Sequence, residues 1–259
     1  MHRRSIYSWI TFLSVLAFFY LPLGVLMLFS FNSNKSMLWE GFSLTWYQTL
    51  FCNSPLLWKA FGNSILIAGL SAAAATVIGT IGAIGVYWYN IKIKKAIQAM
   101  AFIPLFVPEI ILGVSLLIFF ACIGLPLSLF TIFLAHTTFN LPFVFMIIMS
   151  RLDEFDNAII EAAYDLGATE WQTLIKVIIP IAFPGILVSF LMSMTLSLED
   201  FVITFFVAGP GSTTLPLYIY SMIRFGVSPV VNAASVILLI STILFSLVSL
   251  KFFKYVFHE

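Results

Sequence analysis

The sequence contains very few charged residues. Only 9% of its 259 residues are Asp, Glu, Lys or Arg, whereas 61% are hydrophobic. A soluble domain carries about a quarter charged residues, because its surface must be solvated by water. Together with a mean hydropathy of +1.08, this composition argues against a water-soluble fold and predicts an integral membrane protein.

The sequence also lacks an excess of positive charge and of cysteine. Twelve Lys and Arg residues stand against eleven Asp and Glu residues, so no basic face is expected to neutralise the phosphates of a nucleic acid. We therefore expect no nucleic-acid partner. The two cysteines, Cys52 and Cys122, lie far apart in the sequence, and they indicate neither a disulfide framework nor a metal site.

Motifs for nucleotide binding and catalysis are missing as well. The sequence has no G-x-x-x-x-G-K-[ST] loop, and no arrangement of a nucleophile with a base stands out. We therefore expect no enzyme activity, no catalytic residues and no cofactor in this chain. Energy for any transport must come from a partner that binds ATP or from an ion gradient.

Long apolar runs dominate what is present. A helix needs about 20 mostly apolar residues to cross the hydrocarbon core of a membrane. Six runs reach this length, which predicts an all-α membrane protein with six transmembrane helices in a single domain, residues 1–259. The expected spans are residues 9–31, 63–88, 96–123, 128–149, 181–206 and 230–253. The first is too long for the apolar part of a signal peptide and should remain as an anchor.

The distribution of basic residues predicts the orientation. The positive-inside rule favours cytoplasmic N- and C-termini, because only Lys35, Lys59 and Arg224 then lie outside. The basic residues expected inside are Arg3, Arg4, Lys92, Lys94, Lys95, Arg151, Lys176, Lys251 and Lys254. The six tryptophans fall at or beyond the ends of the spans, where amphipathic rings favour the lipid headgroup zone.

The second span has small residues along one face. They recur at spacings of three and four residues, which is typical of a helix that packs closely against another helix. The alternative is that they are scattered, since membrane helices are generally rich in glycine. The residues concerned are Gly69, Ala73, Ala75, Gly79, Gly82, Ala83 and Gly85.

Residues 150–180 form the only sizeable cytoplasmic loop and hold six of the eleven acids: Asp153, Glu154, Asp156, Glu161, Asp165 and Glu170. Asn157 can cap a short helix, and Gly167 suits the left-handed position that ends it. A second amphipathic turn should follow before Pro180 opens the fifth span. The apolar positions of the two segments are Ile159, Ile160, Ala163, Leu166, Trp171, Leu174, Ile175 and Ile178.

An amphipathic pair of helices must cover its apolar stripe. The stripe could lie on the membrane surface or in the groove of a partner. Anionic lipids attract basic helices rather than acidic ones. The acidity of residues 150–180 therefore favours a cytoplasmic protein partner.

The same loop resembles a known motif. Glu161-Ala162-Ala163, Gly167-Ala168 and the tail Val177-Ile178-Ile179-Pro180 resemble the EAA motif of inner-membrane permease subunits of ABC importers, with Val and Ile in place of the usual Ile and Leu. In that family the segment is a coupling helix that docks on the ATPase subunit. The resemblance implies this role here for Glu161, Ala162, Ala163, Asp165, Gly167 and Ala168.

Short phrases along the whole chain extend the resemblance to PotC-type permeases of spermidine/putrescine importers. One departure is Glu109, where Asp is expected. The phrases are Trp46-Tyr47, Val107-Pro108-Glu109, Ala135–Phe139 with Pro142, Leu196–Asp200, Gly209-Pro210, Ile219–Met222, Gly226–Pro229 and Asn232-Ala233. The resemblance implies the type I importer fold and four kinds of partner: a homologous permease subunit, ATPase subunits that bind the ATP, an extracytoplasmic solute-binding protein and a polyamine.

Three carboxylates at membrane depth give a signal that is independent of the resemblance. Glu109 in the third span, and Glu199 and Asp200 in the fifth, are each roughly 20 Å from the cytoplasmic end of a continuous helix. A charge near the membrane centre costs at least about 2.5 kcal/mol, and spans two to five contain no Lys or Arg. We therefore expect these acids to face one wet cavity and to attract a cationic solute.

Structural roles for these acids are the alternative to a role in solute binding. Glu109 could bond backbone groups freed by Pro104 and Pro108. One of the adjacent pair Glu199 and Asp200 must point away, because successive helical residues are about 100° apart.

The hypothesis that combines these features is a polyamine pathway. The separated ammonium groups of a polyamine suit carboxylates on two helices, and Tyr218, Tyr220 and Phe201 could offer aromatic faces to them. His136 in the fourth span could relay protons, but a hydrogen bond that packs helices together is favoured.

Three classes of function compete. An ABC importer permease explains both the EAA loop and the acids, and it is the prediction we adopt; the solute could also belong to a related importer. A gradient-driven cation carrier would use the acids, but this class of protein does not explain the EAA loop. A non-transporting scaffold would need neither.

Overall fold

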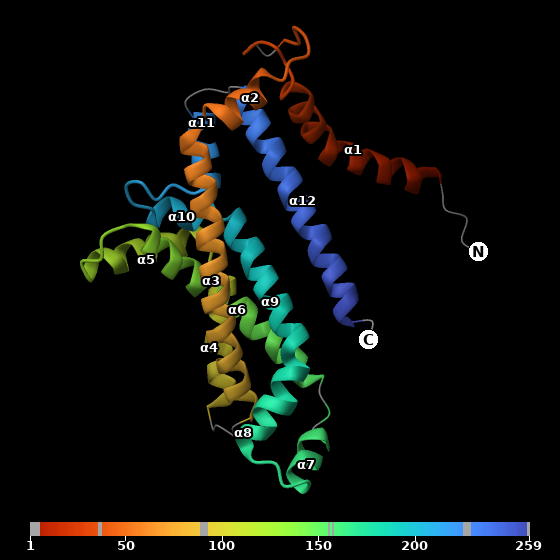
Figure 1. Cartoon of the computed structure of the whole chain (residues 1–259), viewed down its shortest axis with the longest axis vertical. Helices are drawn as coiled ribbons and strands as arrows, with labels where there is room; N and C mark the ends of the chain where they lie inside the picture. Colours follow the sequence, from red (N-terminus) through yellow and green to blue (C-terminus); the bar gives the residue numbers. More distant parts are fainter. Residues whose placement is uncertain are drawn as a thin grey trace. The chain divides into compact units, whose positions relative to one another are not determined.

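The computed structural model describes residues 6–35, 38–88, 93–154, 156, 158–224 and 229–257 (Figure 1). These residues form helices and one isolated bridge, between Asn32 and Phe42. The predicted all-α class is confirmed. The chain divides into two compact units: residues 1–58 with 218–245, and residues 59–217 with 246–259.

Some sequence predictions fall outside this description. They concern Arg3, Arg4, Lys92, the cap at Asn157, the phrase 226–228, and the side chains of Lys251 and Lys254.

The first unit begins with α1, Ile6–Phe29, an apolar helix whose side chains are almost all exposed. A turn follows in which the buried Asn32 side chain donates to the Leu38 carbonyl oxygen at 2.8 Å and accepts from the Glu40 amide at 3.0 Å. The short helix α2, Thr45–Cys52, comes next. The segment between the first two predicted spans therefore contains a helix.

The core of the second unit is built on three long helices: α3, Pro55–Trp88; α6, Leu129–Asp153; and α9, Ile179–Glu199. Part of the predicted small face of α3 packs on α6, since Ala75 and Ala83 are fully buried in one cluster with Val144 and Ile148. Ala73 and Gly82, which were predicted on the same face, are exposed. Interdigitation of small and branched residues lets helices approach closely in a membrane.

The third predicted span is not a single helix. It divides into α4, Lys94–Phe106, and α5, Glu109–Cys122, which meet at 105°. Pro108 disfavours the helical region for the residue before it, and Val107 is accordingly extended, with φ −81° and ψ 126°. The prediction of a continuous helix from 96 to 123 was wrong.

The fifth predicted span differs at both ends. The helix α8, Glu170–Thr173, runs through a π-helical turn, Leu174–Ile178, into α9 without a break. Pro180 lacks an amide hydrogen and cannot donate a backbone hydrogen bond. The π turn next to it shifts the register of the helical hydrogen bonds by one residue. At the other end the chain becomes extended at Asp200, with ψ 123°, and α10, Val202–Val207, follows separately.

Polar contacts hold the segment after α10 in the second unit. Thr131 on α6 donates to the Val207 carbonyl oxygen at 2.8 Å. The Asn63 side chain donates to the Thr213 carbonyl oxygen at 2.9 Å, and the Leu215 amide donates to Ser64 at 2.8 Å. The segment between the fifth and sixth predicted spans thus contains an anchored turn and the helix α11, Leu215–Arg224.

Several helices are long and apolar enough to cross a membrane. Among the described residues α1, α3, α6 and the continuous helix Glu170–Glu199 meet this criterion, and the bent pair α4 and α5 meets it together. The last predicted span corresponds to α12, Pro229–Phe257. Each of the six predicted spans therefore has a helical counterpart, with the breaks described above.

Candidate functional site

A cavity of about 360 Å³ in the second unit collects the three acids predicted at membrane depth. Glu109, Glu199 and Asp200 all line it, with apolar walls from α4, α6 and α10. Its volume falls in the range of about 300 to 1,000 Å³ typical of small-molecule sites. The expectation that these acids share one cavity is confirmed.

The cavity lies where the two helix breaks occur. Its wall includes Pro104, Val107 and Glu109 from the first break and Glu199, Asp200 and Phe201 from the second. The helix α4 has 13 residues and at 1.5 Å per residue spans about 20 Å, less than the roughly 30 Å hydrocarbon core. Non-helical backbone at such depth is tolerated where it is covered by protein or faces water.

Two of the acids present unpartnered carboxylates. Glu109 is the first residue of α5 and Glu199 the last residue of α9, and both are exposed. Neither has a hydrogen bond or an ion pair with any residue in the described part of the chain. The structure therefore gives no support to the alternative in which Glu109 bonds backbone groups freed by the prolines.

Asp200 is different, because other groups of the chain hold its carboxylate. Its side chain is only 5% exposed. One carboxylate oxygen, Oδ2, accepts from the Thr204 amide at 2.8 Å and the Thr204 hydroxyl at 2.7 Å, and lies 3.1 Å from His136 Nε2. The other, Oδ1, accepts from the Ile203 amide at 3.2 Å. Asp200 thus caps the start of α10.

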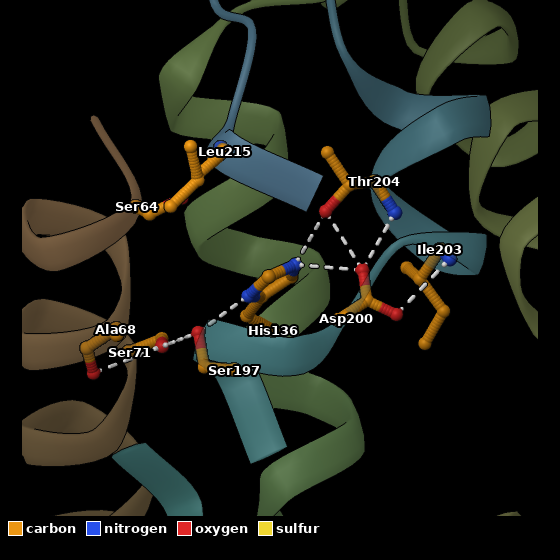
Figure 2. Close-up of polar contacts among 9 residues, drawn as sticks. All are labelled: Ser64, Ala68, Ser71, His136, Ser197, Asp200, Ile203, Thr204 and Leu215. Carbon is orange, nitrogen blue, oxygen red and sulfur yellow. Dashed lines mark hydrogen bonds and ion pairs between the residues drawn. The ribbon is translucent and has the colours of Figure 1, made fainter. Parts of the chain in front are cut away.

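His136 joins Asp200 to the rest of the core, as Figure 2 shows. The imidazole is 1% exposed, with Nδ1 2.6 Å from Ser197 Oγ and Nε2 2.9 Å from Thr204 Oγ1. Ser71 on α3 donates to Ser197 at 3.2 Å. We call Ser71, His136, Ser197, Asp200 and Thr204 the His136 network. The expected role of His136 in hydrogen bonding between helices is confirmed.

The network is satisfied by a neutral imidazole. If Nε2 carries the proton, it donates to Asp200, while Nδ1 accepts from the Ser197 hydroxyl. Ser197 then accepts from Ser71, and the Thr204 hydroxyl donates to Asp200. Every donor in this chain of bonds points towards the carboxylate, so the negative charge is stabilised without a basic residue.

Aromatic rings form part of the cavity wall. Phe201, which was predicted to offer an aromatic face to the solute, lines the cavity. Phe139 and Phe143 of α6 line it as well. These two phenylalanines were not among the predicted site residues, although their spacing of four places them on one helix face. Tyr218 and Tyr220 belong to the other unit, and their role towards a solute stays a prediction.

The loop 150–180 forms the predicted helix, glycine turn and helix. The helix α7, Ala158–Asp165, is followed by Gly167, which has φ +81°. The Gly167 amide donates to the Tyr164 carbonyl oxygen at 2.8 Å, and the Ala168 amide to that of Ala163 at 3.0 Å. These two bonds define a Schellman cap, and glycine adopts its left-handed position without a steric penalty.

The next helix in this loop begins with a second cap. Thr169 Oγ1 accepts from the Gln172 amide at 3.3 Å, and Gln172 Oε1 accepts from the Thr169 amide at 2.9 Å. This reciprocal pair is a capping box. The two caps leave little freedom in the turn between α7 and α8.

The apolar stripe of the loop is partly buried against the chain and partly exposed. Ile160, Leu174 and Ile178 pack on the cluster of α3, α6 and α9, so part of the predicted stripe is covered by the chain itself. The other part is exposed: Ile159 47%, Leu166 89%, Trp171 71% and Ile175 57%. Glu161, Ala162 and Asp165 are also exposed, whereas Ala163 and Ala168 are half-buried. A surface for another molecule remains.

Comparison with known proteins gives the class. Residues 75–256 match the family described as binding-protein-dependent transport system inner membrane component. The chain belongs to this family. Membership of a family of transport components agrees with the missing nucleotide and catalytic motifs.

Individual relatives match over most of the chain. The spermidine/putrescine transport system permease protein PotC of Escherichia coli K12 is 40% identical over 237 residues, which covers 91% of this chain and 89% of PotC. PotC of Haemophilus influenzae is 41% identical, with 87% and 88% covered. The putrescine transport system permease protein PotI of E. coli K12 is 38% identical, with 91% and 86% covered.

Solved structures support the fold. A chain of a bacterial ABC transporter involved in the import of alginate superposes with a TM-score of 0.77 at 18% identity, covering 95% of this chain and 93% of that one. A chain of the MetNI methionine ABC transporter gives 0.68 at 22% identity, covering 79% and 99%. The predicted type I importer permease fold is confirmed; these low identities carry no information on the solute.

Proposed function

We propose that this chain is the permease subunit of an ATP-driven importer of polyamines, spermidine or putrescine or both, and forms half of the translocation pathway. The observation that carries the proposal is the cavity in which Glu109 and Glu199 present carboxylates without a partner in the described residues. The PotC and PotI relatives, whose names refer to these solutes, support the same cargo.

The chemistry of the cavity suits a flexible polycation. Glu109 and Glu199 come from different helices, so two separated ammonium groups can each meet a carboxylate in place of water. The rings of Phe139, Phe143 and Phe201 offer faces that attract cations and cover the methylene segments between them. Because the described residues that line the cavity include no Lys or Arg, a cationic solute is the natural counter-charge.

The proposed partners follow from the family. A homologous permease completes the pathway, an extracytoplasmic binding protein delivers the solute, and ATPase subunits bind the ATP. The exposed part of the loop 150–180, with Leu166 and Trp171, would dock on the ATPase. The proposed orientation in a bacterial inner membrane places both termini and this loop in the cytoplasm, with lipid around the apolar helices.

Movement of the ATPase subunits would reach the cavity through a continuous helix. The segment Glu170–Glu199 begins in the loop and ends at an acid of the cavity. A shift of α8 is therefore transmitted along the helix to Glu199. This connection offers a physical route for alternating access of the cavity to the two sides of the membrane.

The test is uptake of labelled spermidine by the complete complex in proteoliposomes, with ATP enclosed in the lumen and the binding protein added outside. Competition with putrescine, an amino acid and an inorganic cation establishes the cargo. Glu109→Gln and Glu199→Gln should each raise the KM about tenfold, whereas Glu109→Asp and Glu199→Asp keep the charge and should lose less.

Three outcomes would overturn the proposal. An active complex that ignores polyamines would refute the cargo. Unchanged uptake in both Gln variants, at matched expression, would refute the role of the acids. Uptake that ignores ATP depletion and collapses with the proton gradient would indicate a gradient-driven carrier instead.

A further inference from the structure

The three acids of the cavity are held in two different ways. Glu109 and Glu199 are exposed, while Asp200 is buried and bonded to His136, Ile203 and Thr204. We propose that His136 is a positioning residue: through Asp200 it holds the junction of α9 and α10, and so sets the separation of Glu109 and Glu199 and the length of polyamine they accept. This inference rests on the proposed function.

The first step of the argument is the junction itself. The chain leaves the helix at Asp200, and α10 starts two residues later. Asp200 accepts three bonds from Ile203 and Thr204, which fix the direction in which α10 sets out. Glu199 is the residue directly before this junction, so a rotation of the Asp200 backbone changes the position of α10 relative to the Glu199 carboxylate.

The second step is the attachment of the junction to the core. The bonds from Asp200 to Ile203 and Thr204 are local and would turn together with α10. His136 lies on α6 and supplies the contact from a separate helix, 3.1 Å from Asp200 and 2.9 Å from Thr204. Its other nitrogen lies 2.6 Å from Ser197, which Ser71 of α3 also contacts. Figure 2 shows the imidazole between these two groups of partners.

The third step connects α10 to Glu109. The helix α5, which starts with Glu109, packs closely on α10 at Gly113. A Cβ atom at position 113 would lie 2.7 Å from the Phe206 ring and 3.4 Å from Ile203 Cα. Such close packing leaves little room for α5 to slide independently. The position of α10 therefore determines where α5 places Glu109.

Both partnerless carboxylates thus depend on the same anchor. Glu199 depends on it through the chain, and Glu109 depends on it through the packing of α5. Polyamines differ in the number and spacing of their ammonium groups, so a change in the separation of the two acids alters the preference between them. His136 does not contact the solute, because its ring is buried against Asp200 and Phe139.

The experiment compares three substitutions of His136 in the complete complex. The amide nitrogen of Gln lies near the position of Nε2, so His136→Gln keeps a donor for Asp200. The amide of Asn lies near Nδ1, so His136→Asn keeps only the contact with Ser197. His136→Leu removes both contacts. Thr138→Val is the matched control, because Thr138 is exposed on the same helix and bonds only its own helix, at the Leu134 carbonyl oxygen.

The measurements are the KM and kcat for uptake of spermidine and of putrescine, and the ratio of the two KM values. We expect the ratio to shift at least about threefold, and the KM to rise about tenfold, in the Leu and Asn variants, with kcat changed less; a displacement of about 1 Å can cost up to about a hundredfold at such sites. His136→Gln should stay near the wild type, and Thr138→Val should match it.

Several results would decide against the inference. If the Gln and Asn variants behave alike, the link to Asp200 is not what matters. If the Leu and Asn variants are folded and keep the wild-type KM ratio, His136 only stabilises the chain. If His136→Leu fails to assemble, the Gln and Asn pair decides the question. Failure of the wild-type complex to import any polyamine would refute the proposed function instead. This outcome is measured on the wild type alone and does not depend on the variants.

Discussion

Gly79 on α3 lies directly against Val144 on α6. A Cβ atom at position 79 would stand 2.6 Å from a methyl carbon of Val144 and 2.9 Å from its Cβ atom. Real Cβ contacts are not this short, so one helix must move if any side chain is added. The contact sits among fully buried residues, since Ala75 and Val144 have no exposed surface.

Gly79→Ala should therefore destabilise the second unit. Overpacking of this kind typically costs about 1 to 3 kcal/mol, which exceeds the gain in helix propensity of about 1 kcal/mol. Thermal unfolding of the complex in nanodiscs would show a lower Tm. Gly69→Ala is the matched control on the same helix, because nothing lies within 4 Å of the position where its Cβ would be. An equal Tm in both variants would contradict the packing described here.

The turn at Gly167 makes a second prediction. A β-branched residue there must adopt φ +81°, a conformation that costs roughly 1 to 2 kcal/mol for residues other than glycine. Gly167→Val should break the Schellman cap and reorient α7, so that ATP hydrolysis no longer drives uptake although the chain still inserts and assembles. Uptake and ATPase activity measured together would show this uncoupling.

Asparagine provides the comparison at this position. It enters the left-handed region more easily than other residues, so Gly167→Asn should retain part of the coupled activity. Normal transport by Gly167→Val would refute the assignment of residues 150–180 as the coupling loop.

Thr131 makes a third prediction. Its buried hydroxyl donates to the Val207 carbonyl oxygen at 2.8 Å and accepts from the Ser128 amide at 2.8 Å. Thr131→Val leaves both groups without this partner and should lower the free energy of unfolding by about 1 to 3 kcal/mol. Thr131→Ser keeps the hydroxyl and should lose less. A Val variant as stable as the Ser variant, by thermal unfolding, would show that these bonds do not stabilise the end of α10.

Much of the fold could be predicted, because length and apolar composition are sufficient for α1, α3 and α6. The breaks could not be placed by composition. The helices on either side of Val107 are together as apolar as a membrane span, so composition does not reveal the 105° bend between them. Pro108 was the available signal at the first break.

The site was predicted in part for a similar reason. The depth of the acids could be estimated from residue spacing, but the pairing of His136 with Asp200 joins residues 64 positions apart, which no local pattern encodes. One local bond was readable, since Ile203 follows Asp200 by three residues, the spacing at which a carboxylate caps a helix start. The sequence also does not reveal whether Glu109 and Glu199 have bonding partners, because this depends on which helix faces lie against the cavity.

The end of α5 has a practical consequence for spectroscopy. Glu109 begins this helix, and Cys122 ends it with a free, exposed thiol. At 1.5 Å per residue the two ends are about 20 Å apart, so a probe attached to the thiol would not crowd the cavity. Cys52 is the other cysteine of the sequence, and Cys52→Ser leaves one native labelling position. The protein can therefore report the motion of its own acid-bearing helix during turnover without an introduced cysteine.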